Sequence, residues 1–129
     1  MPNKELPQLS PTELEVMKIL WAEGRKSARE VHERLAEPQG WAYSTTRTTV
    51  ERLVRKGYVE KKAFHGLHLY KPRISRARGL ARMVQDFARQ VLETTQVPVA
   101  ALFAESGALT ADEVAELEGL LAEAAEDSR

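Results

Sequence analysis

The sequence predicts a mainly α-helical fold with one small β-hairpin: a winged helix-turn-helix over residues 1–74, followed by a helical dimerisation tail over residues 75–129. Three observations predict it. Two helical segments begin with capping signals, and a third segment with helical periodicity follows them. Two short β-prone runs then flank a two-residue turn. Beyond a boundary near residues 72–78, apolar segments continue to residue 127.

Length and composition limit the classes of protein to consider. The chain has 129 residues, 43% of them hydrophobic, which suits one domain or a small domain with an appendage. It has no cysteine, which excludes disulfides, thiolate metal sites and a cysteine nucleophile. No apolar run approaches the roughly 20 residues of a membrane span, and no signal peptide is recognised. We therefore expect a cytoplasmic protein that does not insert into a membrane.

The charges are segregated along the chain although the net charge is zero. Residues 41–73 carry eight basic and two acidic groups, whereas residues 93–129 carry nine acidic groups and one arginine. This asymmetry indicates a polyanion-binding surface that is separate from an acidic partner surface. The alternative is that both are ordinary solvated faces.

Residues 9–24 predict the first helix. Ser10 is the expected N-cap, Pro11 occupies the first helical position, and Glu13 completes an S-x-x-E capping box. Gly24 is suited to end the helix because glycine readily adopts a positive φ.

Residues 27–40 predict a second helix that also opens with an S-x-x-E capping box. Ser27 and Glu30 form a second capping box, and Val31 and Leu35 are expected to face inward. Two short helices joined by a tight turn are half of a helix-turn-helix unit.

The third helix is expected from about residue 44 to residue 56, with Gly57 after its end. Its exact N-cap is left open, and Ser44 is one candidate. The face expected to pack inward comprises Thr46, Val50, Leu53 and Val54. The residues expected to point outward are Ser44, Thr45, Arg47, Thr48, Glu51, Arg52 and Arg55.

Two short strands are expected after this helix, over residues 58–64 and 67–72. The two residues between them, His65 and Gly66, suit a tight hairpin turn because glycine tolerates a positive φ. Two helices, a third with a polar face and a basic hairpin follow the order of a winged helix-turn-helix.

The third helix contains four threonines, which propagate helices poorly because their side chains are β-branched. A helix that enters the DNA major groove accounts for them. Threonine offers a hydroxyl group and a methyl group that can touch thymine, and arginine can bind guanine with two hydrogen bonds. The N-terminus of a helix also favours phosphate. The alternative is a threonine-rich surface helix that is held only by tertiary packing.

Three stretches of the chain resemble the amino-terminal domain of the BlaI/MecI/CopY penicillinase-repressor family. They are LSPTELEVMKILW (residues 9–21), STTRTTVERLVRKGYVEKK (44–62) and LYKP (69–72), and the resemblance extends into the tail. It implies a homodimeric, sequence-specific transcriptional repressor that binds a palindromic operator in double-stranded DNA. One departure is that Ala42 and Tyr43 stand where many relatives have Ser-Pro.

The resemblance also implies roles for single residues. Those expected to read bases or occupy the groove are Ser44, Thr45, Arg47 and Thr48. Those expected to reach phosphates are Arg52 and Arg55, and those expected on or near the wing are Lys61 and Lys62.

The tail contains an amphipathic segment at residues 79–95, a short apolar segment at 97–107 and a helix at 109–127 that opens with a Thr110–Glu113 capping box. So small an apolar tail is not expected to be stable alone, so we expect it to pack against an identical tail in a twofold dimer. The alternative is that it folds back on its own winged domain. The residues expected to mediate dimerisation are Leu80, Met83, Val84, Phe87, Val91, Leu102, Phe103, Val114, Leu117, Leu120 and Leu121.

The resemblance further suggests how the repressor is released. In relatives of the β-lactam type, a membrane sensor metalloprotease triggers cleavage between the tail helices in response to antibiotic. The matching bond here is Leu102–Phe103, although such relatives carry Asn where Leu102 stands. Copper-responsive relatives use a C-terminal cysteine cluster, which this chain lacks.

No other class of function is indicated as strongly. His32, His65 and His68 lack the spacing of metal ligands and are expected on the surface or wing, so we expect no metal and no cofactor. No acid–base pair, nucleophile or phosphate loop stands out, so an enzyme such as a small nuclease is not expected. The alternative function is a winged-helix adaptor that binds proteins without sequence-specific DNA binding.

Overall fold

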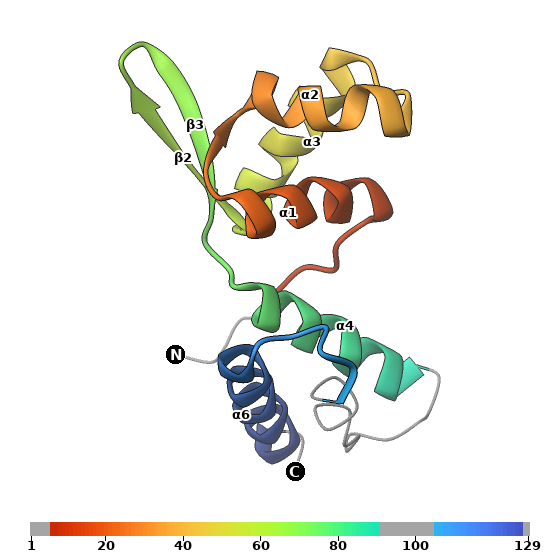
Figure 1. The fold of residues 1–129 in the computed structure, drawn as a ribbon. Helices are drawn as coiled ribbons and strands as arrows, with labels where there is room; N and C mark the ends of the chain where they lie inside the picture. Colours follow the sequence, from red (N-terminus) through yellow and green to blue (C-terminus); the bar gives the residue numbers. More distant parts are fainter. Residues whose placement is uncertain (1–5, 91–104, 128–129) are drawn as a thin grey trace. The chain divides into compact units, whose positions relative to one another are not determined.

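The structure is a computed structural model that describes residues 6–90 and 105–127 (Figure 1). The chain forms two compact units, Met1–Ile74 and Ser75–Arg129, which we call unit 1 and unit 2. Of the described residues, none lies in a helix that is both long enough and apolar enough to cross a membrane.

Over its described residues 6–74, unit 1 contains three helices and a small antiparallel sheet with strand order β1-β3-β2 (Figure 1). Its elements are α1 (Pro11–Glu23), β1 (Lys26–Ser27), α2 (Ala28–Gln39), α3 (Tyr43–Lys56), β2 (Val59–Phe64) and β3 (Leu67–Pro72). The predicted winged helix-turn-helix fold is therefore confirmed. The short strand β1 was not predicted, because two residues are too few to show a periodicity.

Both predicted capping boxes are present. Ser10 Oγ accepts the Glu13 N–H at 3.2 Å, and Glu13 Oε1 accepts the Ser10 N–H at 2.7 Å. Ser27 and Glu30 make the same pair of bonds at 3.2 and 2.9 Å at the start of α2. Because each box satisfies backbone N–H groups that the helix cannot, both helices begin at the predicted residues.

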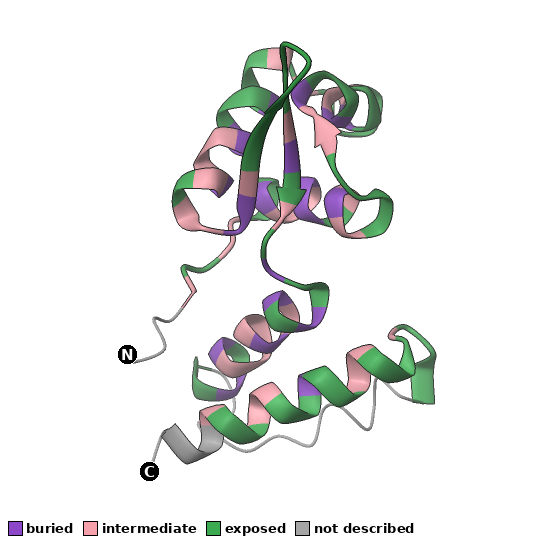
Figure 2. Ribbon diagram, turned by 90° about the vertical axis from the view of Figure 1, so that its left-hand side faces the viewer, coloured by how far each residue is buried: buried purple, intermediate pink, exposed green. Residues whose placement is uncertain are grey.

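The core of unit 1 lies where α1, α2, α3 and the base of the hairpin meet, as the purple segments of Figure 2 show. The fully buried hydrophobic side chains there include Val16, Met17, Leu20, Val31, Val50, Leu53 and Tyr58. Trp21 packs at the edge of this core, and its indole N–H donates to the Ile74 carbonyl at 2.8 Å. The core thus fixes α3 against both other helices.

The start of α3 differs from the prediction. The helix begins at Tyr43 and its N-cap is Ala42, which has an extended backbone with φ −75° and ψ 157°. The Ala42 carbonyl accepts the Thr45 N–H at 3.0 Å, which places Ser44 inside the first turn rather than at the cap. The predicted end is confirmed, because Gly57 has a φ of 86°.

The hairpin forms as predicted. Strands β2 and β3 pair antiparallel from Val59 opposite Pro72 to Phe64 opposite Leu67. His65 and Gly66 both have positive φ, 47° and 81°, as a two-residue type I′ turn requires.

Unit 2 contains α4 (Arg76–Gln90) and α6 (Ala111–Asp127) among its described residues. Leu117 of α6 is completely buried in a small cluster with Ala77 and Ala81 of α4. The predicted capping box is present, because Glu113 Oε1 accepts the Thr110 N–H at 3.0 Å and Thr110 Oγ1 accepts the Glu113 N–H at 3.1 Å. The α4 helix begins at Arg76, three residues before the predicted segment.

Candidate nucleic-acid interface

The four threonines of α3 divide into two pairs. Thr46 and Thr49 are buried, and their hydroxyl groups are used inside the unit. The Thr49 hydroxyl donates to the Thr45 carbonyl at 2.7 Å, and Thr46 Oγ1 lies 2.9 Å from Nδ1 of His32. Thr45 and Thr48 are exposed. Half of the β-branched residues therefore hold the helix in place, and the other half are available at the surface.

His32 is not the surface histidine that the sequence suggested. It is half-buried between α2 and α3, and its ring meets the Tyr43 ring edge-on with centroids 5.4 Å apart. The Arg29 guanidinium lies over the Tyr43 ring, with its Cζ 4.8 Å from the ring centroid. These contacts, with the hydrogen bond to Thr46, anchor the first turn of α3.

One side of α3 is exposed, and most of the predicted contact residues lie there. Ser44, Thr45, Arg47, Thr48 and Arg55 are exposed. At 100° per residue, Ser44, Thr48 and Arg55 occupy the centre of this arc. The N-terminal end adds a second feature: among the described residues no side chain caps the helix. Backbone N–H groups of its first turn therefore have no side-chain acceptor.

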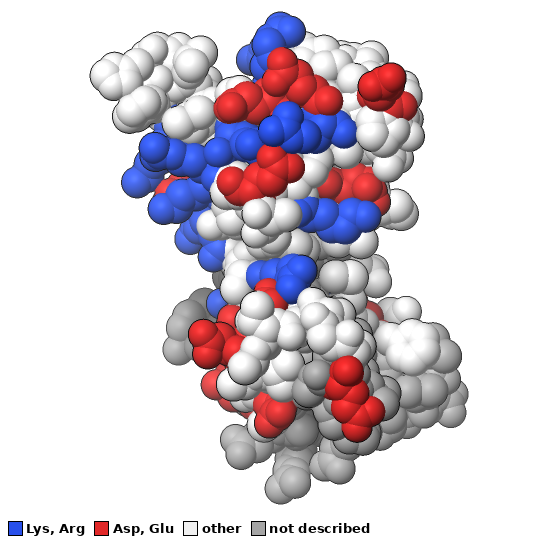
Figure 3. Space-filling view, viewed as in Figure 1, with Lys and Arg blue, Asp and Glu red and all other residues white. Residues whose placement is uncertain are grey.

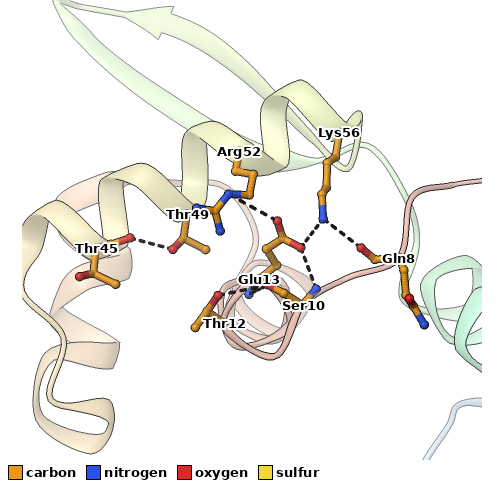
Figure 4. A network of polar contacts seen from close by, with 8 residues as sticks. All are labelled: Gln8, Ser10, Thr12, Glu13, Thr45, Thr49, Arg52 and Lys56. Atoms are coloured by element: carbon orange, nitrogen blue, oxygen red, sulfur yellow. Dashed lines mark hydrogen bonds and ion pairs between the residues drawn. The ribbon is translucent and has the colours of Figure 1, made fainter.

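Arg52, predicted to reach phosphate, lies at the edge of this arc next to α1. Its Nε is 4.0 Å from Oε2 of Glu13, a carboxylate whose side chain is 0% exposed (Figure 4). Lys56 Nζ binds the other oxygen, Oε1, at 2.6 Å and also donates to the Gln8 carbonyl at 2.9 Å. Glu13 thus joins the start of α1 to the last two turns of α3.

The ionisation of Glu13 follows from these contacts. Burial alone would raise the pKa of this carboxyl, but hydrogen bonds from the Lys56 ammonium and the Ser10 N–H outweigh it and lower the pKa. Its Oε2 atom has no hydrogen-bond partner among the described residues. Glu13 is therefore a charged, buried group that depends on its basic neighbours.

The two predicted wing lysines lie on β2 but on opposite faces of the hairpin. Lys61 stands opposite Tyr70 and turns toward α3, where its Nζ binds Glu51 Oε2 at 3.1 Å. Lys62 stands opposite Leu69 on the other face, and its side chain is 69% exposed. Its Nζ lies 3.8 Å from Glu60 Oε1. The space-filling view shows Lys and Arg gathered along the hairpin below its uncharged tip (Figure 3).

The residues predicted to mediate dimerisation differ in how far they are buried within unit 2. Leu117 is completely buried within its own chain, and four others pack half-buried around it: Leu80, Val114, Leu120 and Leu121. Met83 and Val84 are half-buried, and Phe87 is 54% exposed. Val91 and both residues of the predicted cleavage site, Leu102 and Phe103, lie outside the described residues.

Within the described ranges, no three His, Cys, Asp or Glu side chains gather in a way that could hold a metal ion. The sequence did not predict the buried contact between Glu13 and Lys56 or the role of Glu51. For Glu51 a signal existed, because it is the one acidic residue in a basic, polar helix. The burial of Glu13 gave no local signal, since its partner lies 43 residues away.

Comparison with known proteins shows which family the chain resembles. The penicillinase repressor family matches residues 9–123. The chain is 28% identical over 120 residues to the penicillinase repressor of Bacillus licheniformis, covering 93% of this chain and 94% of that protein. It is 27% identical over 121 residues to the methicillin resistance regulatory protein MecI of Staphylococcus aureus (strain N315), covering 94% and 98%.

Two solved structures resemble the fold. The solution structure of the DNA-binding domain of the repressor BlaI matches with a TM-score of 0.51 and 33% identity, covering 57% of this chain and 89% of that chain. The Bacillus licheniformis BlaI monomeric form in complex with the blaP half-operator matches with a TM-score of 0.51, 32% identity and the same coverage. The chain therefore belongs to the penicillinase repressor family, which consists of transcriptional repressors and not of enzymes.

Proposed function

We propose that this repressor binds a palindromic operator as a homodimer, with one α3 helix in the major groove of each half-site. The observation that carries the proposal is the exposed arc of α3, where small hydroxylated side chains and arginines stand beside a lysine-bearing hairpin. A similar fold in BlaI was solved with a half-operator, which supports the same use of this unit. The proposed site of action is the cytoplasm, where the repressor would have access to operator DNA on the chromosome.

The dimensions and chemistry of α3 suit base recognition. Its 14 residues span roughly 21 Å, which exceeds the width of the major groove, about 12 Å. Ser44, Thr45 and Thr48 are short enough for the backbone to approach base edges closely. Arg47 can bind O6 and N7 of guanine with two hydrogen bonds. These four residues are our proposed base-reading set.

Phosphate contacts surround this set. Arg55 is exposed near the end of α3, and Lys62 projects from the outer face of the wing. In the part of the chain that the structure describes, no side chain caps the first turn of α3, whose N–H groups carry the positive end of the helix dipole. Arg52 would have to turn from Glu13 to contact a phosphate, which its half-exposed position permits. Such contacts position the helix without reading sequence.

The proposed dimer forms through unit 2. Phe87 exposes a large apolar side chain on α4, next to the half-buried Met83 and Val84 one turn earlier. An apolar stripe of this kind is normally covered, and a second copy of the same helix would cover it symmetrically. Two α3 helices about one turn of DNA apart would then read a palindrome.

Release by proteolysis is the regulatory part of the proposal. The bond proposed for cleavage is Leu102–Phe103, and the partner is a membrane sensor metalloprotease. The support is the family resemblance in this segment. Incubation with activated sensor protease should yield a fragment ending at Leu102, and an intact chain after prolonged incubation would remove this part without affecting DNA binding.

Selection from random duplex DNA tests the main proposal. Repeated selection with the full chain should enrich a motif with twofold symmetry and half-sites one helical turn apart. The affinity should fall by orders of magnitude between ~50 and ~200 mM salt, as expected when several phosphates are contacted. A protein-binding adaptor would instead enrich no motif and show no such salt dependence.

A further inference from the structure

Glu51 is the acidic residue of α3, and it interrupts a basic surface. It lies four residues after Arg47 and four before Arg55, so all three belong to neighbouring turns of one helix. A carboxylate at this place opposes the approach of phosphate, and nothing in the proposed function requires it. Its contacts show what it does instead.

Glu51 is bound to the wing by two groups that are paired across the hairpin. Its Oε2 accepts the Tyr70 hydroxyl at 2.5 Å and the Lys61 ammonium at 3.1 Å. Lys61 and Tyr70 stand directly opposite each other on β2 and β3, and Lys61 Nζ lies 5.9 Å from the Tyr70 ring centroid. Tyr70 is buried, so this cluster is anchored in the core.

The cluster holds Glu51 in its charged form. The hydrogen bond from Tyr70 lowers the pKa of the Glu51 carboxyl, and the nearby Lys61 lowers it further. Burial raises this pKa, but its effect is smaller than that of the Tyr70 hydrogen bond. Burial and the bond to Glu51 raise the pKa of the Tyr70 hydroxyl, so it keeps its proton and remains a donor. At neutral pH the Lys61 charge is therefore neutralised by a fixed carboxylate.

From this geometry we infer that Glu51 limits the overall DNA affinity of the repressor by withholding Lys61 from DNA phosphates. The inference rests on the proposed function of α3 and the wing. A lysine that can reach phosphate strengthens binding to every duplex equally, because phosphates carry no sequence information. By retaining Lys61, Glu51 lowers the affinity for operator and for random duplex by about the same factor, so the ratio between the two affinities stays unchanged. Lys62, on the other face of the wing, is held less closely, because its Nζ lies 3.8 Å from Glu60 Oε1 and its side chain is 69% exposed.

The test is Glu51→Gln in the full chain, with binding to a selected operator duplex and to a random-sequence duplex measured over a range of salt. Glutamine keeps the acceptor for Tyr70 and removes the charge that holds Lys61. One added phosphate contact should steepen the salt dependence by about 0.9 in log–log slope, which is about a fivefold to tenfold gain in affinity for random duplex near 0.1 M salt. The affinity for the operator should rise by about the same factor, so the ratio of operator to random affinity should stay unchanged.

Lys61→Met separates the proposed mechanism from simple repulsion by the carboxylate. In the Glu51→Gln background, Lys61→Met should abolish the gain in random-duplex affinity. In the wild-type background, Lys61→Met should cost less affinity than Lys62→Ala, which removes the matched lysine on the opposite face. The Lys61→Met result stands even when the Glu51 variant folds poorly, which tryptophan fluorescence during urea unfolding would reveal.

Three outcomes would overturn the inference: no change in random-duplex affinity, a gain that persists without Lys61, or a loss confined to one base pair of the operator. The last would show that Glu51 reads a base, as carboxylates can at cytosine N4. Wild-type protein that binds neither duplex at low salt would instead refute the proposed function itself.

Discussion

The buried Glu13–Lys56 pair yields the sharpest prediction about stability. Lys56→Met removes the ammonium 2.6 Å from Glu13 Oε1 and leaves a carboxylate whose side chain is 0% exposed. Removing one partner of a buried pair typically costs about 3–5 kcal/mol. We expect the lower end, about 3 kcal/mol, because the Ser10 N–H still binds Glu13 and Arg52 lies near.

Urea unfolding followed by tryptophan fluorescence measures this cost for unit 1 alone, because both tryptophans, Trp21 and Trp41, lie in it. Lys18→Met is the matched control: Lys18 pairs with Glu15 on the surface of α1 at 2.9 Å and is 57% exposed. Its loss should cost less than about 1 kcal/mol.

Two further comparisons check the cause. Adding Glu13→Gln to Lys56→Met should recover part of the loss, because no charge is then left buried. In the wild type the folded-state pKa of Glu13 lies below its ordinary value of 4.5, so its contribution is present above pH 4.5 and is lost as the pH falls through the folded value. The gap between wild type and Lys56→Met should therefore narrow in acid. Equal losses for Lys56→Met and Lys18→Met would refute this reasoning.

Four other predictions follow from the structure. Arg47→Ala should cost about 1–3 kcal/mol on the operator and relax specificity at one position, as measured by competition between single-base variants of the duplex. Lys62→Ala should weaken all duplexes about equally and reduce the salt slope by about 1, and a sequence-dependent loss would contradict a phosphate contact. Phe87→Asp should shift the chain toward monomer in sedimentation equilibrium without changing unfolding of unit 1. Hydrogen bonds from Arg76 and the Thr110 N–H lower the pKa of Glu113 to about 2, so the stability it gives unit 2 should be complete above pH 4.5 and lost as the pH falls toward 2, which helical circular dichroism during acid titration can follow.

Local signals in the sequence predicted the three helices and the hairpin of unit 1, but not the two-residue strand β1. The Ser10 and Ser27 capping boxes, the turn at His65 and Gly66, and the glycine after α3 each act within a few residues, so their patterns could be read directly. The helix α3 begins at Tyr43, one residue before the approximate start that the sequence predicts, and its N-cap could not be predicted. Its N-cap, Ala42, has no side-chain acceptor and so leaves no local signature.

The contacts that position α3 could not be predicted in the same way. Glu13 meets Lys56 across 43 residues, and Glu51 meets Tyr70 across 19, so neither pairing appears in a local periodicity. His32 was expected on the surface because a lone histidine in a polar helix has no distinctive pattern. The candidate site was thus predictable as a set of exposed residues on one helix, but the groups that orient the helix required coordinates.

Backbone amide chemical shifts of the ¹⁵N-labelled full chain, titrated with the selected duplex, test the central claim most directly. The claim predicts the largest changes at Ser44, Thr45, Arg47 and Thr48 of α3, with a second set at Lys62 on the wing. Changes confined to α4 and α6, with α3 unaffected at saturating duplex, would contradict it.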